Sequence, residues 1–147
     1  MELKLTPLGV GNGTSYILRG NPSSSFVVSK HNEPLLMIDC GVGIGLTYQQ
    51  LFGEKLPEYI YLTHNHLDHT GELPILLLDF SKRKKSPVQI LGNQKVINIV
   101  RKYRMHELYD TGINIDKIAT WVVADEEGVI QLSDGLMLKL VESQHSY

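Results

Sequence analysis

The sequence predicts a layered α/β domain, in which a mixed sheet packs against helices. Three observations support this prediction. The first third of the chain alternates short strands with turns, and the middle alternates strands with helices. Apolar residues make up 42% of 147 residues, which is a globular composition at the size of one domain. We therefore expect a single domain over residues 1–147.

The N-terminal elements are identified by alternation and by the turns between them. Leu3 and Leu5 alternate with charged residues, which is typical of a strand, and glycines then form a loop. The apolar run that ends at Asp39 is unbroken, which predicts a strand buried on both faces. Further strands are expected at 15–18 and 25–29, with a turn at 31–34 before the buried strand at 35–38.

The rest of the chain alternates strands with helices before it ends in strands. Pro74 falls in the first turn of a predicted helix, where its missing donor does no harm. Asp134-Gly135 is a strong hairpin signal between the last two strands. The expected elements are helices at 46–51, 72–82 and 94–108, and strands at 59–62, 88–91, 118–123, 129–132 and 136–141.

Charge and cysteine content exclude several classes of protein. A formal net charge of −2 gives no general attraction to nucleic acid or to an anionic membrane. A single cysteine excludes an internal disulfide. The longest apolar run, at 75–78, is far too short to cross a bilayer, and the N-terminus lacks the pattern of a signal peptide. We expect a cytoplasmic protein with no membrane partner.

The most informative segment is His64-x-His66-x-Asp68-His69, which directly follows the strand predicted at 59–62. Residues i and i+2 of an extended segment point the same way, so His64 and His66 can present two imidazoles to one ion. Asp68 and His69 lie one turn later and can reach a second ion. Imidazole and carboxylate together suit Zn²⁺, and also Mn²⁺ or Fe²⁺.

A catalytic zinc usually has three protein ligands and one open position. His145, which follows the strand predicted at 136–141, is the best candidate for the third ligand. Metal coordination lowers the pKa of bound water to about 7, and two ions about 3.5–4 Å apart can hold both the hydroxide and an oxyanion. A solvated histidine-rich loop, and an ordinary histidine at position 145, remain the alternatives.

These residues resemble the metallo-β-lactamase superfamily, whose signature is His-x-His-x-Asp-His after a strand. Leu36–Gly41 is also similar to the superfamily's apolar strand that ends in Asp-x-Gly. The resemblance implies an αβ/βα sandwich with a two-metal site at the edge of its sheets. It also implies that Asp39 orients a metal ligand and does not bind the metal itself, so that it fixes the tautomer of an imidazole.

Within the superfamily, the chain most resembles the ribonuclease Z and phosphodiesterase branch. The similar stretches run in the branch's order, at 8–13, 19–27, 71–74, 87–92 and 141–147. The resemblance implies a zinc-dependent hydrolase whose substrate is RNA or a small phosphodiester. The two expected activities are ribonuclease Z-like processing of the tRNA 3′ end and hydrolysis of a cyclic nucleotide. Asp68 would then be catalytic, because it would orient the metal-bound hydroxide as well as bind metal.

The sequence ends just after the third motif of this branch, at Tyr147. Members of the branch continue with a second β-layer, a metal-bridging Asp and a final His ligand. The resemblance implies His64, His66 and His145 on one metal and Asp68 and His69 on a second. Because this sequence lacks the remaining ligands of the second metal, we expect that metal to bind weakly or not at all. We expect only the first half of the sandwich, from an N-terminal fragment, a truncated product or half of a split enzyme. A sheet face left uncovered favours association, either with a second copy as a homodimer or with a complementary C-terminal half.

Two other functions remain open at this point. The chain is a catalytically incomplete fragment or subunit that acts as a binding module, or it is a lactonase or thioesterase of the same fold. The first is motivated by the early end of the sequence. The second follows because a metal-bound hydroxide attacks carbonyl carbon as well as phosphorus.

Overall fold

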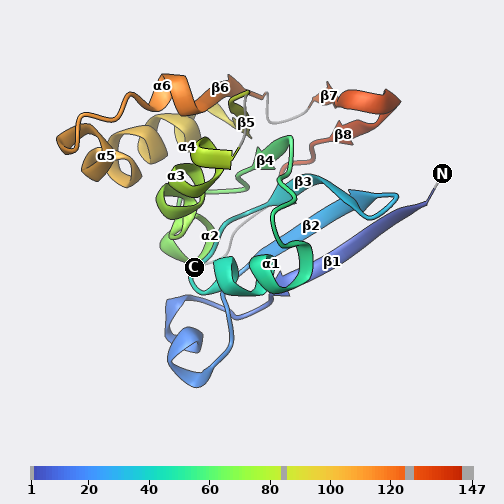
Figure 1. Cartoon of the computed structure of the whole chain (residues 1–147), viewed down its shortest axis with the longest axis horizontal. Helices are drawn as coiled ribbons and strands as arrows, with labels where there is room; N and C mark the ends of the chain where they lie inside the picture. Colours follow the sequence, from blue (N-terminus) through green and yellow to red (C-terminus); the bar gives the residue numbers. More distant parts are fainter. Residues whose placement is uncertain (1, 84–85, 125–127, 144–147) are drawn as a thin grey trace.

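The computed structural model describes residues 2–83, 86–124 and 128–143, and its core is a six-stranded mixed sheet (Figure 1). The strand order is β1-β2-β3-β4-β5-β6, with antiparallel pairing from β1 to β3 and parallel pairing from β3 to β6. A separate antiparallel pair, β7-β8, follows. The strands are β1 (Leu3–Gly9), β2 (Ser25–Lys30), β3 (Glu33–Ile38), β4 (Tyr59–Tyr61), β5 (Val88–Gly92), β6 (Ala119–Val123), β7 (Val129–Gln131) and β8 (Met137–Lys139).

Helices connect the parallel strands, and the predicted α/β class is confirmed. They are α1 (Ile44–Phe52), α2 (Leu67–Thr70), α3 (Leu73–Arg83), α4 (Gln94–Ile99), α5 (His106–Asp110) and α6 (Ile115–Ile118). Three tighter or wider turns complete them: η1 (Thr14–Arg19), η2 (Val100–Arg104) and η3 (Ser133–Gly135). Among the described residues, no helix is both long and apolar enough to cross a bilayer.

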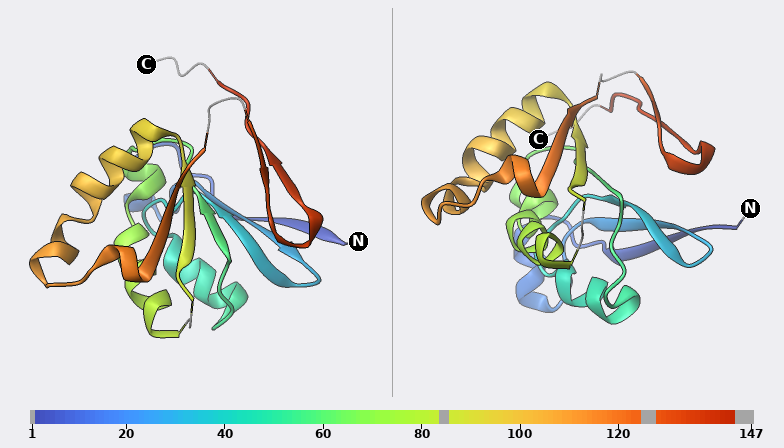
Figure 2. Two further views of the ribbon diagram at one scale, coloured as in Figure 1. Left: turned by 90° about the horizontal axis from the view of Figure 1, so that it is seen from above. Right: turned by 45° about the horizontal axis from the view of Figure 1, so that its top comes forward.

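The two faces of the sheet belong to different apolar clusters, because successive residues of a strand point to opposite faces. Met37, Ile60 and Ile90 are fully buried on the face that the helices cover. Leu36, Tyr59 and Leu91 lie on the other face, in a cluster that includes Leu132 and packs against the β7-β8 pair. Figure 2 shows this hairpin over the side of the sheet away from the helices. We expected one face of the sheet to be uncovered, but the β7-β8 pair of the same chain covers part of it.

The strand predicted at 15–18 is wrong, because this segment forms the 3₁₀ helix η1. Gly13 and Gly20 flank it with φ of 73° and 80°, in the left-handed region that favours glycine. The Gly20 and Asn21 N–H groups then donate to the Ile17 and Tyr16 carbonyls and close the helical turn. Glycines at both ends thus override the strand-like apolar pattern between them.

The single helix predicted at 94–108 is interrupted by η2, which is a π-helical turn. The buried side chains explain the interruption. Val96 and Val100 are one α-helical turn apart, whereas the next buried residue, Met105, comes five positions after Val100. A wide turn of i→i+5 type inserts the extra residue and keeps Met105 in the core. It also places Arg104 just outside the core.

The turn predicted at 31–34 is shorter than expected. His31 and Asn32 form it alone, with φ of 51° and 63°, as a tight hairpin turn requires. Glu33 and Pro34 already belong to β3. The pairing of β2 with β3 shifts register between Val28 and Ser29, opposite this point. Such an irregularity tolerates the missing donor of a proline.

Candidate metal centre

The candidate site lies where β3 and β4 end, side by side, at the carboxyl edge of the parallel part of the sheet. Asp39 directly follows β3, and the segment from Thr63 to His69 follows β4. The ends of these two strands are joined by a hydrogen bond of 2.9 Å from the Asp39 N–H to the Tyr61 carbonyl. Ligand sites of open α/β sheets form at this edge, because loops from neighbouring strands converge there.

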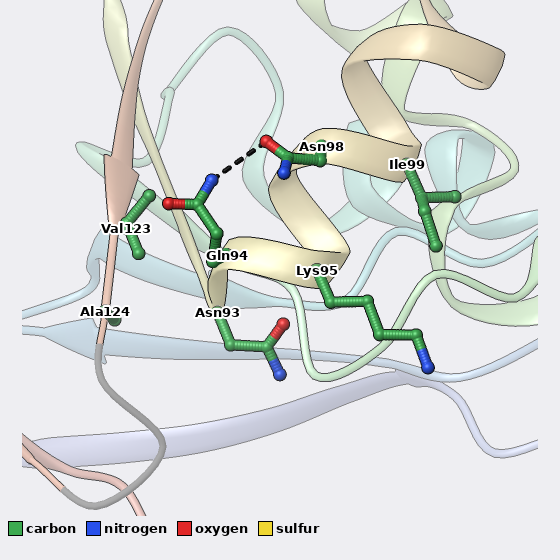
Figure 3. A pocket seen from close by; sticks show the side chains of 7 residues that line it. All are labelled: Asn93, Gln94, Lys95, Asn98, Ile99, Val123 and Ala124. Atoms are coloured by element: carbon green, nitrogen blue, oxygen red, sulfur yellow. Dashed lines mark hydrogen bonds between the residues drawn. The ribbon is translucent and has the colours of Figure 1, made fainter.

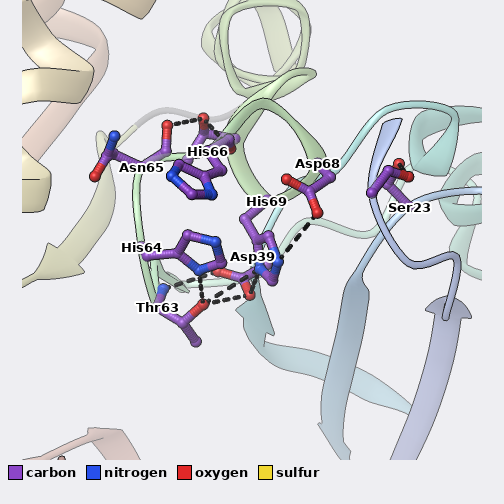
Figure 4. Close-up of polar contacts among 10 residues, drawn as sticks. Ser23, Asp39, Thr63, His64, Asn65, His66, Asp68 and His69 are labelled. Carbon is purple, nitrogen blue, oxygen red and sulfur yellow. Dashed lines mark hydrogen bonds and ion pairs between the residues drawn. The ribbon is translucent and has the colours of Figure 1, made fainter. Parts of the chain in front are cut away.

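Asp39 is a buried carboxylate that organises the loop after β4 (Figure 4). It accepts hydrogen bonds from the Thr63 N–H at 2.8 Å, the Thr63 hydroxyl at 2.7 Å and His69 Nδ1 at 2.6 Å. Its φ of 60° is left-handed, a conformation that Asp tolerates better than most residues. Because Asp39 accepts a hydrogen bond from Nδ1, the neutral imidazole of His69 is held in the tautomer with its proton on Nδ1, which leaves Nε2 as an acceptor.

His64, Asp68 and His69 form a group that could hold a metal ion, since their ligand atoms all lie within 4.8 Å of one another. His69 Nε2, the nitrogen turned away from Asp39, lies 3.6 Å from Asp68 Oδ2. Two ligands of a tetrahedral zinc are about 3.4 Å apart, given metal–ligand distances of about 2.1 Å. The separation and the donor types therefore fit a divalent ion between these side chains.

His66 is outside this three-residue group, although its ring contacts that of His64 edge-on at 4.7 Å between centroids. The His64 ring also lies 3.7 Å from that of His69. The structure thus gathers the three histidines of the motif, but it groups His64 with Asp68 and His69. Shared coordination of one ion by His64 and His66 stays a prediction. His145, the expected third ligand, lies outside the described residues.

The electrostatic environment favours the metal-binding form of His64. Burial lowers the pKa of this imidazole, and the neighbouring His69 lowers it further. A histidine binds a metal ion only when the coordinating nitrogen is unprotonated. His64 therefore stays available to a metal at a pH where an ordinary imidazole begins to be protonated.

The segment after β3 packs directly against the metal loop. The Cys40 N–H donates to the His69 carbonyl at 2.6 Å. A Cβ atom at position 41 would lie 2.2 Å from the Asp68 carbonyl oxygen, so only glycine permits this approach. In the Asp-x-Gly pattern at 39–41, the aspartate thus accepts a hydrogen bond from His69, and the glycine has no side chain that would clash with the backbone of Asp68.

Thr63 and Glu72 are among the supporting side chains of the site that sequence reasoning missed. Thr63 gives Asp39 two of its three hydrogen bonds, and the only signal was its place between the strand and His64. Glu72 accepts from the N–H groups of Gly43 at 2.5 Å and Gly45 at 2.6 Å, at the start of α1. A carboxylate there satisfies free donors and complements the helix dipole. Glu72 therefore has a structural role.

Cys40 is expected to resist thiol reagents in the native protein. Its side chain is fully buried, and burial raises its pKa well above the ordinary value, with Asp39 and Glu72 adding to the effect. Because the thiolate is the reactive form, alkylation with iodoacetamide at pH 8 should be slow until the protein is unfolded in guanidinium chloride. Rapid labelling of the folded, metal-free protein, followed by mass spectrometry, would contradict this packing.

An open pocket of about 660 Å³ lies at the ends of the next two strands, β5 and β6 (Figure 3). The Leu62 N–H donates to the Leu91 carbonyl, and the Ala124 N–H donates to the Gly92 carbonyl. The ends of β4, β5 and β6 therefore lie along the same edge of the sheet as Thr63. The pocket shares no lining residue with the segment from Thr63 to His69, but β5, at whose end it lies, pairs directly with β4. Its lining consists of Asn93, Gln94, Lys95, Asn98, Ile99, Val123 and Ala124.

Comparison with solved structures identifies the fold as that of metallo-β-lactamases, as the sequence motifs predicted. The metallo-β-lactamase fold protein YhfI from Bacillus subtilis matches with a TM-score of 0.66 and 13% identity over 90% of this chain and 50% of its own. Zn²⁺-bound PqqB from Methylobacterium extorquens matches with a TM-score of 0.71 and 15% identity over 96% and 56%.

The short form of human tRNase Z is more similar in sequence. It is 25% identical, with a TM-score of 0.59, over 82% of this chain and 44% of its own. The chain thus spans about half the length of each of these three solved structures. No curated protein matches the sequence. Residues 3–147 match a family described as anti-Pycsar protein Apyc1.

Proposed function

The chain belongs to the anti-Pycsar protein Apyc1 family, and from this premise we propose that it is the metal-binding part of a metal-dependent phosphodiesterase. The observation that carries the proposal is the group formed by His64, Asp68 and His69, with Asp39 behind His69. A hydrolase of the metallo-β-lactamase fold is the class that this geometry and the solved relatives support. The similarity to human tRNase Z favours phosphorus over carbonyl carbon as the centre attacked.

Each residue of the group has a distinct part in this function. A divalent ion bound there would act as a Lewis acid and would lower the pKa of a coordinated water to about 7. His64 and His69 present neutral nitrogens to it, with His66 and His145 as the further ligands that we propose. Asp68 would hold the ion together with His69, and its carboxylate would orient the attacking water. Asp39 keeps the proton of His69 on Nδ1, away from the ion.

Within this class we propose a small phosphodiester, such as a cyclic nucleotide, in preference to RNA. The net charge of −2 offers little attraction to a long polyanion. The pocket at the ends of β5 and β6 is lined by three amide side chains and a lysine, Asn93, Gln94, Asn98 and Lys95. Amides pair with the edges of nucleobases, so this pocket suits the nucleoside part of the substrate.

Metal removal and replacement tests the function directly. Metal-free protein should not hydrolyse bis-p-nitrophenyl phosphate, and added Zn²⁺ or Mn²⁺ should restore turnover. The same activity should be absent from His66→Ala and unchanged in His31→Asn, an exposed histidine whose left-handed φ asparagine accepts. A folded and monodisperse sample that shows no turnover at any metal concentration would leave a binding module as the function.

The choice of substrate is tested on the same preparation. Cyclic nucleotides, an RNA with a 3′ extension, a lactone and a thioester should be compared by kcat/KM. The proposal predicts the highest value for a cyclic nucleotide. A higher value for the RNA would favour a ribonuclease Z-like activity, and a higher value for the lactone or thioester would show that the centre attacked is carbonyl carbon.

A further inference from the structure

Thr70 links the metal loop to a part of the chain that the metal motif does not include. Its side chain is fully buried, and it directly follows His69. The hydroxyl donates to the His66 carbonyl at 2.9 Å and accepts from Nε of Arg104 at 3.0 Å. Arg104 therefore touches the metal loop through Thr70, although it lies 34 residues further along the chain.

The His66 carbonyl is the point at which the loop is held. It accepts from the His69 N–H at 3.0 Å, the Thr70 N–H at 3.0 Å and the Thr70 hydroxyl. These bonds close α2, a helix of only four residues that carries Asp68 and His69. Because so short a helix has no stability of its own, tertiary contacts must hold it in place.

The π-helical turn η2 explains why Arg104 is in position. The extra residue in this turn keeps Val100 and Met105 in the core, and Arg104 lies between them in sequence, half-buried beside Thr70. Its charge polarises the Thr70 hydroxyl, which strengthens the bond from that hydroxyl to the His66 carbonyl. π turns of this kind often occur at functional sites.

We propose that Arg104 is a positioning residue for the metal centre, which acts through Thr70 to hold the turn from His66 to His69 in its metal-binding geometry. The inference rests on the proposed function only in assigning the metal to this loop. These bonds join protein atoms only, so the turn needs no ion in order to form. An ion then meets ligands that do not have to be ordered when it binds, which raises its affinity.

The test measures zinc affinity of the full chain by competition with a chromophoric chelator. Thr70→Val, which keeps the shape but removes the hydroxyl, and Arg104→Met should each weaken binding by about 10-fold or more. Thr70→Ser should restore most of the affinity. The double variant Thr70→Val/Arg104→Met should bind zinc no more weakly than the single variant with the lower affinity, because both substitutions remove the same contact. Arg101→Met, which loses an exposed ion pair with Asp116 and the contact of its guanidinium with the Trp121 ring, is the matched control and should bind as wild type.

Hydrogen exchange of the metal-free proteins gives a second readout that does not depend on turnover. The His69 and Thr70 amides should exchange faster in Thr70→Val and Arg104→Met, and the Ile60 and Ile90 amides of the sheet should not. The proposal is overturned if Arg104→Met binds zinc as tightly as Arg101→Met, if serine at position 70 is no better than valine, or if the two losses add. Wild-type protein that binds zinc without hydrolysing any phosphodiester would contradict the proposed function and leave this inference standing.

Discussion

Replacement of Asp68 with asparagine is expected to abolish metal-dependent hydrolysis and to weaken zinc binding by more than about 100-fold. The side chain lies 3.6 Å from His69 Nε2 and is the only carboxylate in the group with His64 and His69 among the described residues. An amide of the same size fills the same space but carries no charge to offset that of the ion. The loss should therefore exceed the roughly 10- to 100-fold cost of losing a hydrogen-bonding partner of a ligand.

Metal content and thermal unfolding of Asp68→Asn distinguish a lost ligand from a lost fold. The metal-free variant should melt at the wild-type temperature, because Asp68 is not part of either apolar cluster. Asp79→Asn, which removes an exposed carboxylate paired with Arg83 on α3, is the matched control and should bind zinc normally. If Asp68→Asn retains wild-type zinc affinity, the ion is held elsewhere and the proposed centre is wrong.

Replacement of Asp39 with asparagine should weaken zinc binding by about 10- to 100-fold without removing any ligand. The Asn oxygen can still accept from the Thr63 N–H, but its NH₂ group then faces His69 Nδ1, where Asp39 Oδ2 now accepts at 2.6 Å. An NH₂ group donates to Nδ1, so the imidazole must carry its proton on Nε2. That tautomer cannot bind a metal ion through Nε2, the nitrogen nearest to Asp68.

The tautomer change has its own spectroscopic signature. Nitrogen NMR shifts of His69 in the metal-free protein should report a proton on Nδ1 in the wild type and on Nε2 in Asp39→Asn. Asparagine tolerates the left-handed φ of 60° at this position, so backbone strain should not confuse the result. An unchanged tautomer together with unchanged affinity would show that Asp39 serves only to close the loop through Thr63.

The strands and the metal motif could be predicted from local sequence, because each depends on the pattern of residues that are close together in the chain. The unbroken run before Asp39 predicted β3, and the histidine spacing after β4 predicted a metal site. The predictions at 15–18 and 94–108 were wrong because residues outside the apolar pattern, or the packing of the core, decided the local structure. The apolar residues at 15–18 lie between two glycines with positive φ, and the helix at 94–108 had to keep both Val100 and Met105 in the core.

The supporting residues of the site could not be predicted in the same way. Asp39 was identified only by its resemblance to a known motif. Thr63 was indicated only by its place between the strand and His64, and Thr70, Glu72 and Arg104 had no signal in the sequence. Their contacts join residues far apart in sequence, such as Arg104 with Thr70. A hydrogen bond of this kind depends on where two separate elements pack, and no spacing within one element encodes it.

The sequence by itself determined the chemistry of this protein, which is three imidazoles and a carboxylate at the end of a buried strand. Only the tertiary structure decided which of them share a point in space, because His64 joins Asp68 and His69 through the fold of the loop against Asp39 and Gly41. The physical reason is that ligand type is a property of single side chains. Ligand geometry is set by the backbone that packing and buried hydrogen bonds hold in place.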